Sequence, residues 1–180
     1  VFRVDLGTAA LLTTTFIFPA SLLRPLGGWV SDRWGARTAM YATFVPIGAL
    51  FTVLCIPSGV DEQGNAYGLP LWLVVTLVFL IGCTMGIGKA GVYKHIPTYF
   101  PHHVGSVGGL VGMLGGLGGF FLPPMFAYIE KFTGLASTPF IVLTVLTGLT
   151  LIWMHLVISR MKRMNPEMDL VEVPDGARPV

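Results

Sequence analysis

Residues 105–124 read Gly-Ser-Val-Gly-Gly-Leu-Val-Gly-Met-Leu-Gly-Gly-Leu-Gly-Gly-Phe-Phe-Leu-Pro-Pro, and no charged side chain interrupts them. The hydrocarbon core of a bilayer is about 30 Å thick, so a helix needs about 20 mostly apolar residues to cross it. This stretch meets that length and predicts a transmembrane helix. The rest of the chain also consists mainly of long apolar stretches.

The composition agrees with a membrane protein. Of the 180 residues, 53% are hydrophobic and 11% are charged, and the mean hydropathy is +0.74. A soluble domain carries about 25% charged residues, so an ordinary soluble enzyme and a disordered tail are both excluded. The formal net charge is only +2 and the basic residues form no stripe, which excludes a nucleic-acid partner.

Five apolar stretches are long enough to span a lipid bilayer, and no long polar insertion separates them. Because the backbone in lipid must satisfy its own hydrogen bonds, helices are the economical form. The predicted fold class is an all-α membrane protein with five transmembrane helices, forming one domain over residues 1–160. The predicted spans are about 6–30, 36–56, 69–92, 105–129 and 137–158.

The two ends of the chain differ in composition from the predicted spans. Residues 161–180 are polar, contain three prolines and are predicted to form a disordered cytoplasmic tail. The chain begins with Val1 and carries no visible signal peptide. We therefore expect it to be a piece of a longer chain.

Basic residues in the loops predict the orientation, because Lys and Arg favour the cytoplasmic side. The loops after the second and fourth predicted spans carry acids and at most one base. This alternation predicts a multi-pass protein of the cell (inner) membrane, with the N-terminus of the chain outside and its C-terminus cytoplasmic. The bases in the other loops and the tail are Arg33, Arg37, Lys94, Arg160, Lys162 and Arg163.

Arg24 lies within the first predicted span. It precedes Asp32 by eight residues, which places it about 12 Å deeper along a helix. A charge at that depth costs about 2.5 kcal/mol or more unless it is paired or hydrated. The side chain could snorkel to the interface. Alternatively it could face a substrate, since a planar, forked guanidinium suits a small planar oxyanion better than lysine does.

The glycines of residues 105–124 favour the second interpretation. At 100° per residue, all but Gly118 fall on one helical stripe about 120° wide. A face without side chains lets another helix or a ligand approach closely. Gly109 and Gly112 are candidates to face a small anion, at a depth similar to Arg24. The other stripe glycines are assigned to helix packing and gating: Gly105, Gly108, Gly115, Gly116 and Gly119.

The loop after the first span reads Gly28-Trp-Val-Ser-Asp32-Arg33-Trp-Gly35-Ala-Arg37. The two glycines allow a tight return between helices, and Asp32 can cap a helix N-terminus or pair with Arg33 or Arg37. We interpret these residues as a latch for one conformation of a transporter; the alternative is a simple basic turn. The pattern resembles a cytoplasmic loop motif of the major facilitator superfamily.

The resemblance becomes specific in residues 86–101, Gly-Ile-Gly-Lys-Ala-Gly-Val-Tyr-Lys-His-Ile-Pro-Thr-Tyr-Phe-Pro, and in the glycine stretch that follows. With residues 22–28, Leu-Leu-Arg-Pro-Leu-Gly-Gly, they are similar to the nitrate/nitrite porters of the NarK type. That family implies a twelve-helix fold in two halves. This chain would supply helices 8 to 12, an incomplete C-terminal half, and helices 1 to 7 would be its missing partners.

The resemblance also implies roles for individual residues. Arg24 would bind the substrate anion, nitrate or nitrite, opposite an arginine of the other half, with Gly109 and Gly112 beside the anion. Without that second arginine, the chain is not expected to transport alone. Lys89 receives no role, since some members lack a lysine at its position; it could snorkel or pair with an acid of the other half.

The acidic residues bear on the transport mechanism. No Asp or Glu lies in the middle of a predicted span, and proton-coupled carriers usually need a titratable group there. The prediction is therefore nitrate/nitrite exchange by alternating access. Nitrate/proton symport stays open, because the other half could supply the acid, and so does another small-anion carrier of the superfamily.

The remaining reactive side chains predict neither a cofactor nor a metal. No second histidine marks a haem site, and the cysteines predict no disulfide framework. A non-transporting membrane subunit of a respiratory complex stays as an alternative from another class, against which Arg24 and the glycine stripe argue. The histidines and cysteines of the sequence are His95, His102, His103, His155, Cys55 and Cys83.

Overall fold

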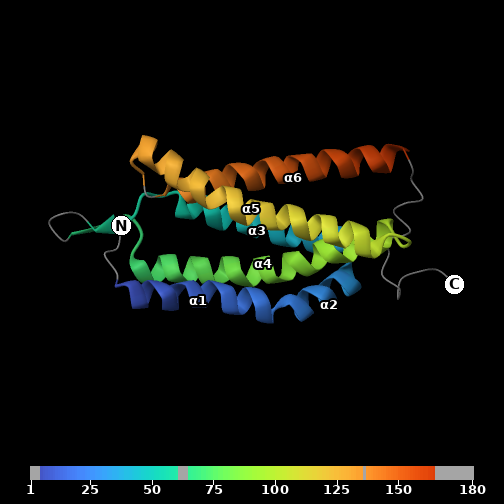
Figure 1. Ribbon diagram of the computed structural model, residues 1–180, viewed down its shortest axis with the longest axis horizontal. Coiled ribbons are helices and arrows are strands. Elements are labelled where there is room, and N and C mark those ends of the chain that lie inside the picture. Colours follow the sequence, from blue (N-terminus) through green and yellow to red (C-terminus); the bar gives the residue numbers. More distant parts are fainter. Residues whose placement is uncertain (1–4, 61–64, 136, 165–180) are drawn as a thin grey trace.

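The structure is a computed structural model that describes residues 5–60, 65–135 and 137–164. Its helices run side by side along the long axis of the molecule (Figure 1). In chain order the elements are α1 (Leu6–Leu22), α2 (Arg24–Trp34), α3 (Ala36–Leu54), β1 (Gly59–Val60), β2 (Ala66–Tyr67), α4 (Leu71–Tyr99), α5 (Val104–Thr133) and α6 (Thr138–Met164).

The helical membrane fold expected from the sequence is confirmed. Four helices are long and apolar enough to cross a membrane, and the bent pair α1–α2 brings the number to as many as five. A short antiparallel hairpin of β1 and β2, in which Gly59 pairs with Tyr67, adds to the predicted all-α architecture.

Three helices extend beyond their predicted ends. α5 continues to Thr133 rather than to about residue 129. α4 continues to Tyr99 rather than to about residue 92, and α6 continues to Met164 rather than to about residue 158. The predicted tail therefore starts inside α6, and its residues 165–180 lie outside the described residues.

The first predicted span is two helices rather than one. α1 and α2 meet at Leu23 with a bend of 42°. Backbone hydrogen bonds on either side persist, from Leu23 N–H to the Pro19 carbonyl at 3.0 Å and from Gly27 N–H to the Leu23 carbonyl at 3.1 Å. Pro25 has no N–H to offer the carbonyl of Ser21, and its ring crowds that carbonyl, which bends the helix.

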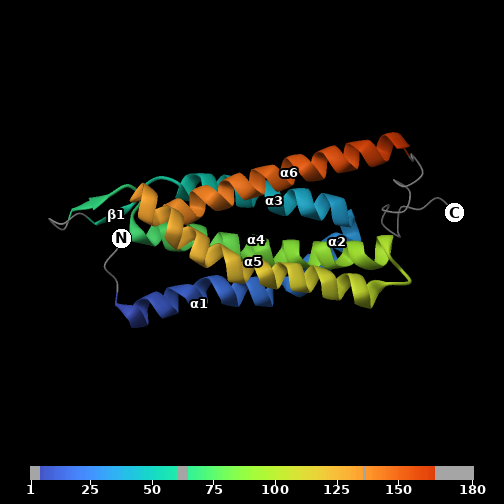
Figure 2. The same cartoon turned by 45° about the horizontal axis from the view of Figure 1, so that its top comes forward.

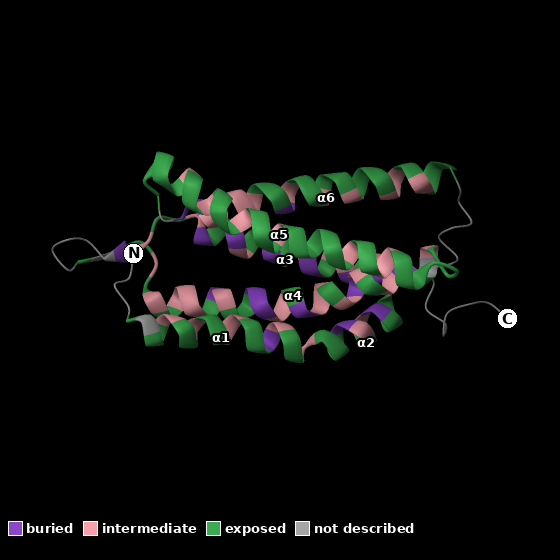
Figure 3. Ribbon diagram, in the orientation of Figure 1, coloured by how far each residue is buried: buried purple, intermediate pink, exposed green. Residues whose placement is uncertain are grey.

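The buried core lies between α3 and α4. Ile47, Phe51 and Leu54 of α3 pack against Leu77 and Ile81 of α4. Most other apolar side chains are exposed, as Figure 3 shows for the outer faces of the helices. This pattern suits a protein surrounded by lipid, where apolar side chains have no reason to turn inward.

α4 is held very close to α1 and α2. A Cβ added to Gly82 or Gly86 of α4 would lie 2.5 or 2.8 Å from a backbone carbonyl oxygen of α1. A Cβ added to Gly27 of α2 would lie 2.5 Å from the carbonyl oxygen of Ile87. Only glycine allows backbones to approach this closely, so these three positions fix how the two elements sit against α4.

α5 is the least embedded helix. It crosses the bundle obliquely and touches α4 and α6 (Figure 2). None of its described residues is buried. One whole side of α5 is therefore open in this chain.

Candidate functional site

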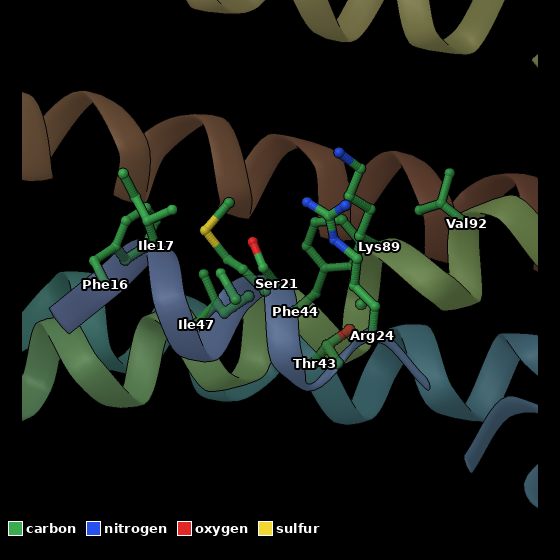
Figure 4. A pocket seen from close by; sticks show the side chains of 12 residues that line it. Phe16, Ile17, Ser21, Arg24, Thr43, Phe44, Ile47, Lys89 and Val92 are labelled. Atoms are coloured by element: carbon green, nitrogen blue, oxygen red, sulfur yellow. The ribbon is translucent and has the colours of Figure 1, made fainter. Parts of the chain in front are cut away.

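A cavity of about 420 Å³ lies among the first four helices. α1 and α3 supply mostly apolar and aromatic walls, whereas α2 and α4 supply the charges (Figure 4). The described residues that line it are Phe16, Ile17, Ala20, Ser21, Arg24, Thr43, Phe44, Ile47, Met85, Gly88, Lys89 and Val92.

The cavity is electropositive. Arg24 and Lys89 both line it, and no acid is found among its described lining residues. The same two side chains line a neighbouring cavity of about 290 Å³, together with Ala90 and Tyr93. Both cations are exposed, so an anion that enters from the open side can reach them.

Arg24 owes its place to the break in the first span. It is the first residue of α2, directly after the bend at Leu23 and before Pro25. Ser21, whose carbonyl loses a helical donor to Pro25, lines the same cavity. Broken helices of this kind often form the binding sites of transporters.

Lys89 owes its place to two close contacts of the residues before it on α4. The preceding residue, Gly88, faces Thr43 of α3, where an added Cβ would lie 3.0 Å from the hydroxyl oxygen. Ile87 lies against Gly27, one turn after Arg24. Lys89 is ten residues before the end of α4 at Tyr99, about 15 Å along the helix, and not one turn before a loop as its predicted span implied.

The stripe glycines do not line this cavity. A Cβ on Gly112 would lie 3.6 Å from the Tyr93 hydroxyl, so Tyr93 lies between the stripe and the two cations. Gly108 faces the side chain of Ile96 at 3.8 Å. The others meet nothing described within 4 Å: Gly105, Gly109, Gly115, Gly116 and Gly119.

The predicted latch residues meet different partners from those expected. Asp32 forms an ion pair with Lys94 of α4, and not with a neighbouring arginine. Arg37 donates a hydrogen bond from Nη2 to the Tyr99 hydroxyl at 3.0 Å. The guanidinium of Arg33 lies 5.8 Å from the centre of the Trp29 ring.

The two latch glycines differ in what they do. Gly35 separates α2 from α3 with φ of 82°, a left-handed conformation that favours glycine. Gly28 lies inside α2, where a Cβ would meet nothing described within 4 Å. Its assignment to a tight return is wrong, because the chain turns seven residues later.

The histidines lie away from the cavity. The Nδ1 atom of His155 is 3.1 Å from the Tyr41 hydroxyl, which links α6 to α3. His95 stacks on Tyr99 with ring centres 5.6 Å apart. Within the described ranges, no three His, Cys, Asp or Glu side chains are grouped so that they could hold a metal ion.

Sequence reasoning missed the residues that build the cavity around Arg24. Lys89 and Tyr93 come from α4, some 65 residues further along the chain, and no local pattern reports such a pairing. The close packing of α4 had a visible signal in Gly82 and Gly86, a small-xxx-small pair inside an apolar run.

Comparison with known proteins identifies the superfamily. The family model described as Major Facilitator Superfamily matches residues 1–172. "Probable nitrate/nitrite antiporter NarK1" of Thermus thermophilus is 55% identical over 175 residues, which cover 93% of this chain and 40% of that protein. "Probable nitrate transporter NarT" of Staphylococcus aureus strain JH9 is 30% identical over 159 residues, covering 86% of this chain and 37% of that protein.

These relatives confirm the expected resemblance to nitrate/nitrite porters. The chain spans about 40% of the length of these curated relatives. No solved structure matches it. Its apolar helices, its broken first span and the match over residues 1–172 lead to one conclusion: the chain belongs to the Major Facilitator Superfamily.

Proposed function

We propose that this chain is part of a transporter that exchanges nitrate for nitrite by alternating access, and that Arg24 binds the anion. The observation that carries the proposal is the position of Arg24 in an open cavity at a broken helix, with no acid among the described lining residues. The names of the relatives, a nitrate/nitrite antiporter and a nitrate transporter, point to the same anions.

The chemistry of the cavity suits a small monovalent oxyanion. The Arg24 guanidinium can offer two parallel N–H donors in one plane. Phe16 and Phe44 supply apolar walls that suit the flat faces of a planar ion. A guanidinium deep in a membrane protein is costly unless something neutralises it, so the site favours occupation by an anion.

We propose further helices as partners of this chain. Such helices would cover the open side of α5, none of whose residues is buried here, and complete the cavity around Arg24. The coverage of about 40% of the relatives' length supports this view. In the family's arrangement, a second arginine from the other half would face Arg24, and Gly109 and Gly112 would lie near the anion from α5.

We also propose the orientation of the chain in the cell (inner) membrane. The ends of α2, α4 and α6 lie at the right of Figure 1. Arg33, Lys94 and Arg160 lie within the last two turns of these helices, and Arg37 lies in the first turn of α3. Lys and Arg concentrate on the cytoplasmic side, so that end is assigned to the cytoplasm. The N-terminus of the chain then lies outside.

Exchange is favoured over proton symport by the acids of the described residues. Asp5, Asp32 and Glu130 all lie at helix ends, away from the cavity. A positive site without a proton acceptor crosses the membrane most easily when an anion occupies it. Nitrate would therefore enter on one half-cycle and nitrite leave on the other.

The test uses the complete transporter that contains these residues, reconstituted in liposomes preloaded with nitrite. Nitrate is added outside with pH and voltage clamped, and wild type is compared with Arg24→Lys. We expect uptake to require internal nitrite, and the variant to lose about tenfold or more in kcat/KM, because lysine cannot form the bidentate contact.

Three results would contradict the proposal in different ways. Uptake that ignores nitrite and follows an imposed proton gradient means symport. Uptake of neither anion by the wild type removes the substrate assignment. Normal transport by Arg24→Lys in either mode removes Arg24 from the site.

A further inference from the structure

We propose that Lys89 is a second ligand of the transported anion, so that the anion is held between the Arg24 guanidinium and the Lys89 ammonium. This inference rests on the proposed function of the cavity. It assigns a role to a residue that the sequence left open between an interfacial anchor and a partner for a distant acid.

The two cations share one site from two elements. Both line the cavity of about 420 Å³, and both line the neighbouring cavity of about 290 Å³. Figure 4 shows their side chains together, with the nitrogen atoms pointing to the same side. An ion that reaches Arg24 through either cavity therefore also meets Lys89.

The depth of Lys89 argues against an interfacial anchor. It lies ten residues before the end of α4, about 15 Å along the helix axis. Lys94, five residues later, is the lysine that reaches the helix ends, where it pairs with Asp32. Snorkelling explains basic residues near the ends of spans. Lys94 is the lysine in that position, and Lys89 lies about 7.5 Å further inside along the same helix.

Close contacts on both sides, one with backbone and one with a side chain, hold Lys89 in register with Arg24. Gly27 lies one turn after Arg24 and against Ile87, two residues before Lys89. Gly88 packs against Thr43 of α3 on the other side. Since glycine contacts of this kind leave little freedom to slide, the two charged side chains leave their helices at neighbouring levels.

Electrostatics then predicts what each cation does. Two like charges in one cavity with no acid among the described lining residues repel each other, and an anion between them relieves that repulsion. Lysine contributes a compact point charge without a preferred plane, whereas arginine orients the ion. Lys89 therefore sets affinity, and its loss should raise KM more than it lowers kcat.

The test compares Lys89→Met and Lys89→Arg with Lys131→Met in the complete transporter, under nitrite-loaded, pH- and voltage-clamped conditions. Methionine keeps most of the length of the unbranched side chain and removes its charge. Lys131 lies in the last turn of α5, outside both cavities, and serves as the matched control. Thermal stabilisation of the detergent-purified variants by nitrate gives their Kd independently of transport.

We expect Lys89→Met to raise both KM and Kd for nitrate about tenfold, with kcat within about threefold of wild type. Lys89→Arg should return both constants to within about threefold, and Lys131→Met should match wild type. These results together would establish Lys89 as a charged ligand of the anion.

Other results overturn the assignment. If KM and Kd are unchanged in Lys89→Met, or if Lys89→Arg fails to restore them, the charge of Lys89 does not bind the anion. If Lys89→Met is unstable, the Kd of Lys89→Arg relative to wild type decides: a value more than tenfold weaker rejects a charge-based role. An inactive wild type would instead reject the proposed function itself.

Discussion

At the scale of single residues, Asp32 shows how far a charged partner can lie along the chain. Its neighbours Arg33 and Arg37 are the bases that the loop pattern offers, yet the fold pairs it with Lys94, 62 residues away. Arg33 and Arg37 instead contact Trp29 and Tyr99. The Asp32–Lys94 ion pair thus ties α2 to α4, the same two helices that carry the cations of the cavity.

The Asp32–Lys94 pair is expected to influence rate rather than affinity. It is partly exposed, with side chains 35% and 67% accessible for Lys94 and Asp32, and such pairs contribute at most about 1 kcal/mol. Asp32→Asn should therefore lower kcat by no more than about fivefold and leave KM unchanged, because Asp32 is outside the cavity.

A double substitution provides the control for this pair. Exchanging the charges, Asp32→Lys with Lys94→Asp, should recover kcat toward wild type in the same liposome assay, since the attraction is restored. A raised KM in Asp32→Asn would place that carboxylate in the anion site. No recovery in the double variant would mean that the ion pair is not what couples α2 to α4.

At the scale of elements, α4 is the helix against which α1, α2 and α3 pack. α3 shares the buried core with it, and α1 and α2 approach it through glycines. Adjacent glycines in α2 allow a sharp test of that approach. A Cβ on Gly27 would lie 2.5 Å from the carbonyl oxygen of Ile87, whereas a Cβ on Gly28 would meet nothing described within 4 Å.

We expect Gly27→Ala to destabilise the protein and Gly28→Ala to leave it close to wild type. Forcing a methyl group against fixed backbone costs about 1–3 kcal/mol, and it would also push Arg24 away from Lys89. Thermal unfolding of the detergent-purified transporter and its KM for nitrate measure the two effects. Equal stability of both variants would show that α2 and α4 are not in backbone contact.

The sequence was sufficient for the type of the helices and the approximate places of the apolar spans, but not for the breaks and contacts of the helices. Apolar length predicts a span directly, because the bilayer sets that length. The bend before Arg24 was missed although Pro25 signals it, since the apolar run continues through the proline. The dense glycines of α5 drew attention to close packing, yet within the described residues the closest backbone approaches between helices are at Gly27, Gly82 and Gly86.

The candidate site was predictable only in part. Arg24 is conspicuous in the sequence because a charge within an apolar run is costly. Lys89 lies in an equally apolar run, but its depth depends on where α4 ends, and the helix continues seven residues beyond the predicted boundary. Helix packing decides which lysine faces which arginine, and the periodicity of the sequence does not report that packing.

At the scale of the whole molecule, one side of α5 is not covered by any other described helix of this chain. Five of its stripe glycines have no described neighbour within 4 Å of an added Cβ. Exposed leucines and phenylalanines suit contact with lipid, but a bare glycine stripe gives lipid little to pack against. Another helix of the transporter is the occupant that such a stripe suits.

We expect Gly116→Leu to reduce nitrate uptake more than tenfold in the complete transporter, and Gly118→Leu to stay within about twofold of wild type. Gly116 lies on the stripe, whereas Gly118 lies off it and faces only Leu122 of its own helix, at 4.0 Å. Uptake normalised to reconstituted protein is the measurement. Equal losses in the two variants would mean that the stripe is not an interface.

The break in the first span has a consequence for how the protein is made. α1 has 17 residues and is only about 25 Å long, which is short of the bilayer core, so the turn with Arg24 and Pro25 must complete the crossing. An arginine there opposes insertion by about 2.5–3.5 kcal/mol. α4 has a mean hydropathy of 2.2 over its most apolar 18 residues, so it inserts readily. It is synthesised later than α1. We therefore expect stable integration of the first segment to depend on its contacts with α4 at Gly27, Gly82 and Gly86.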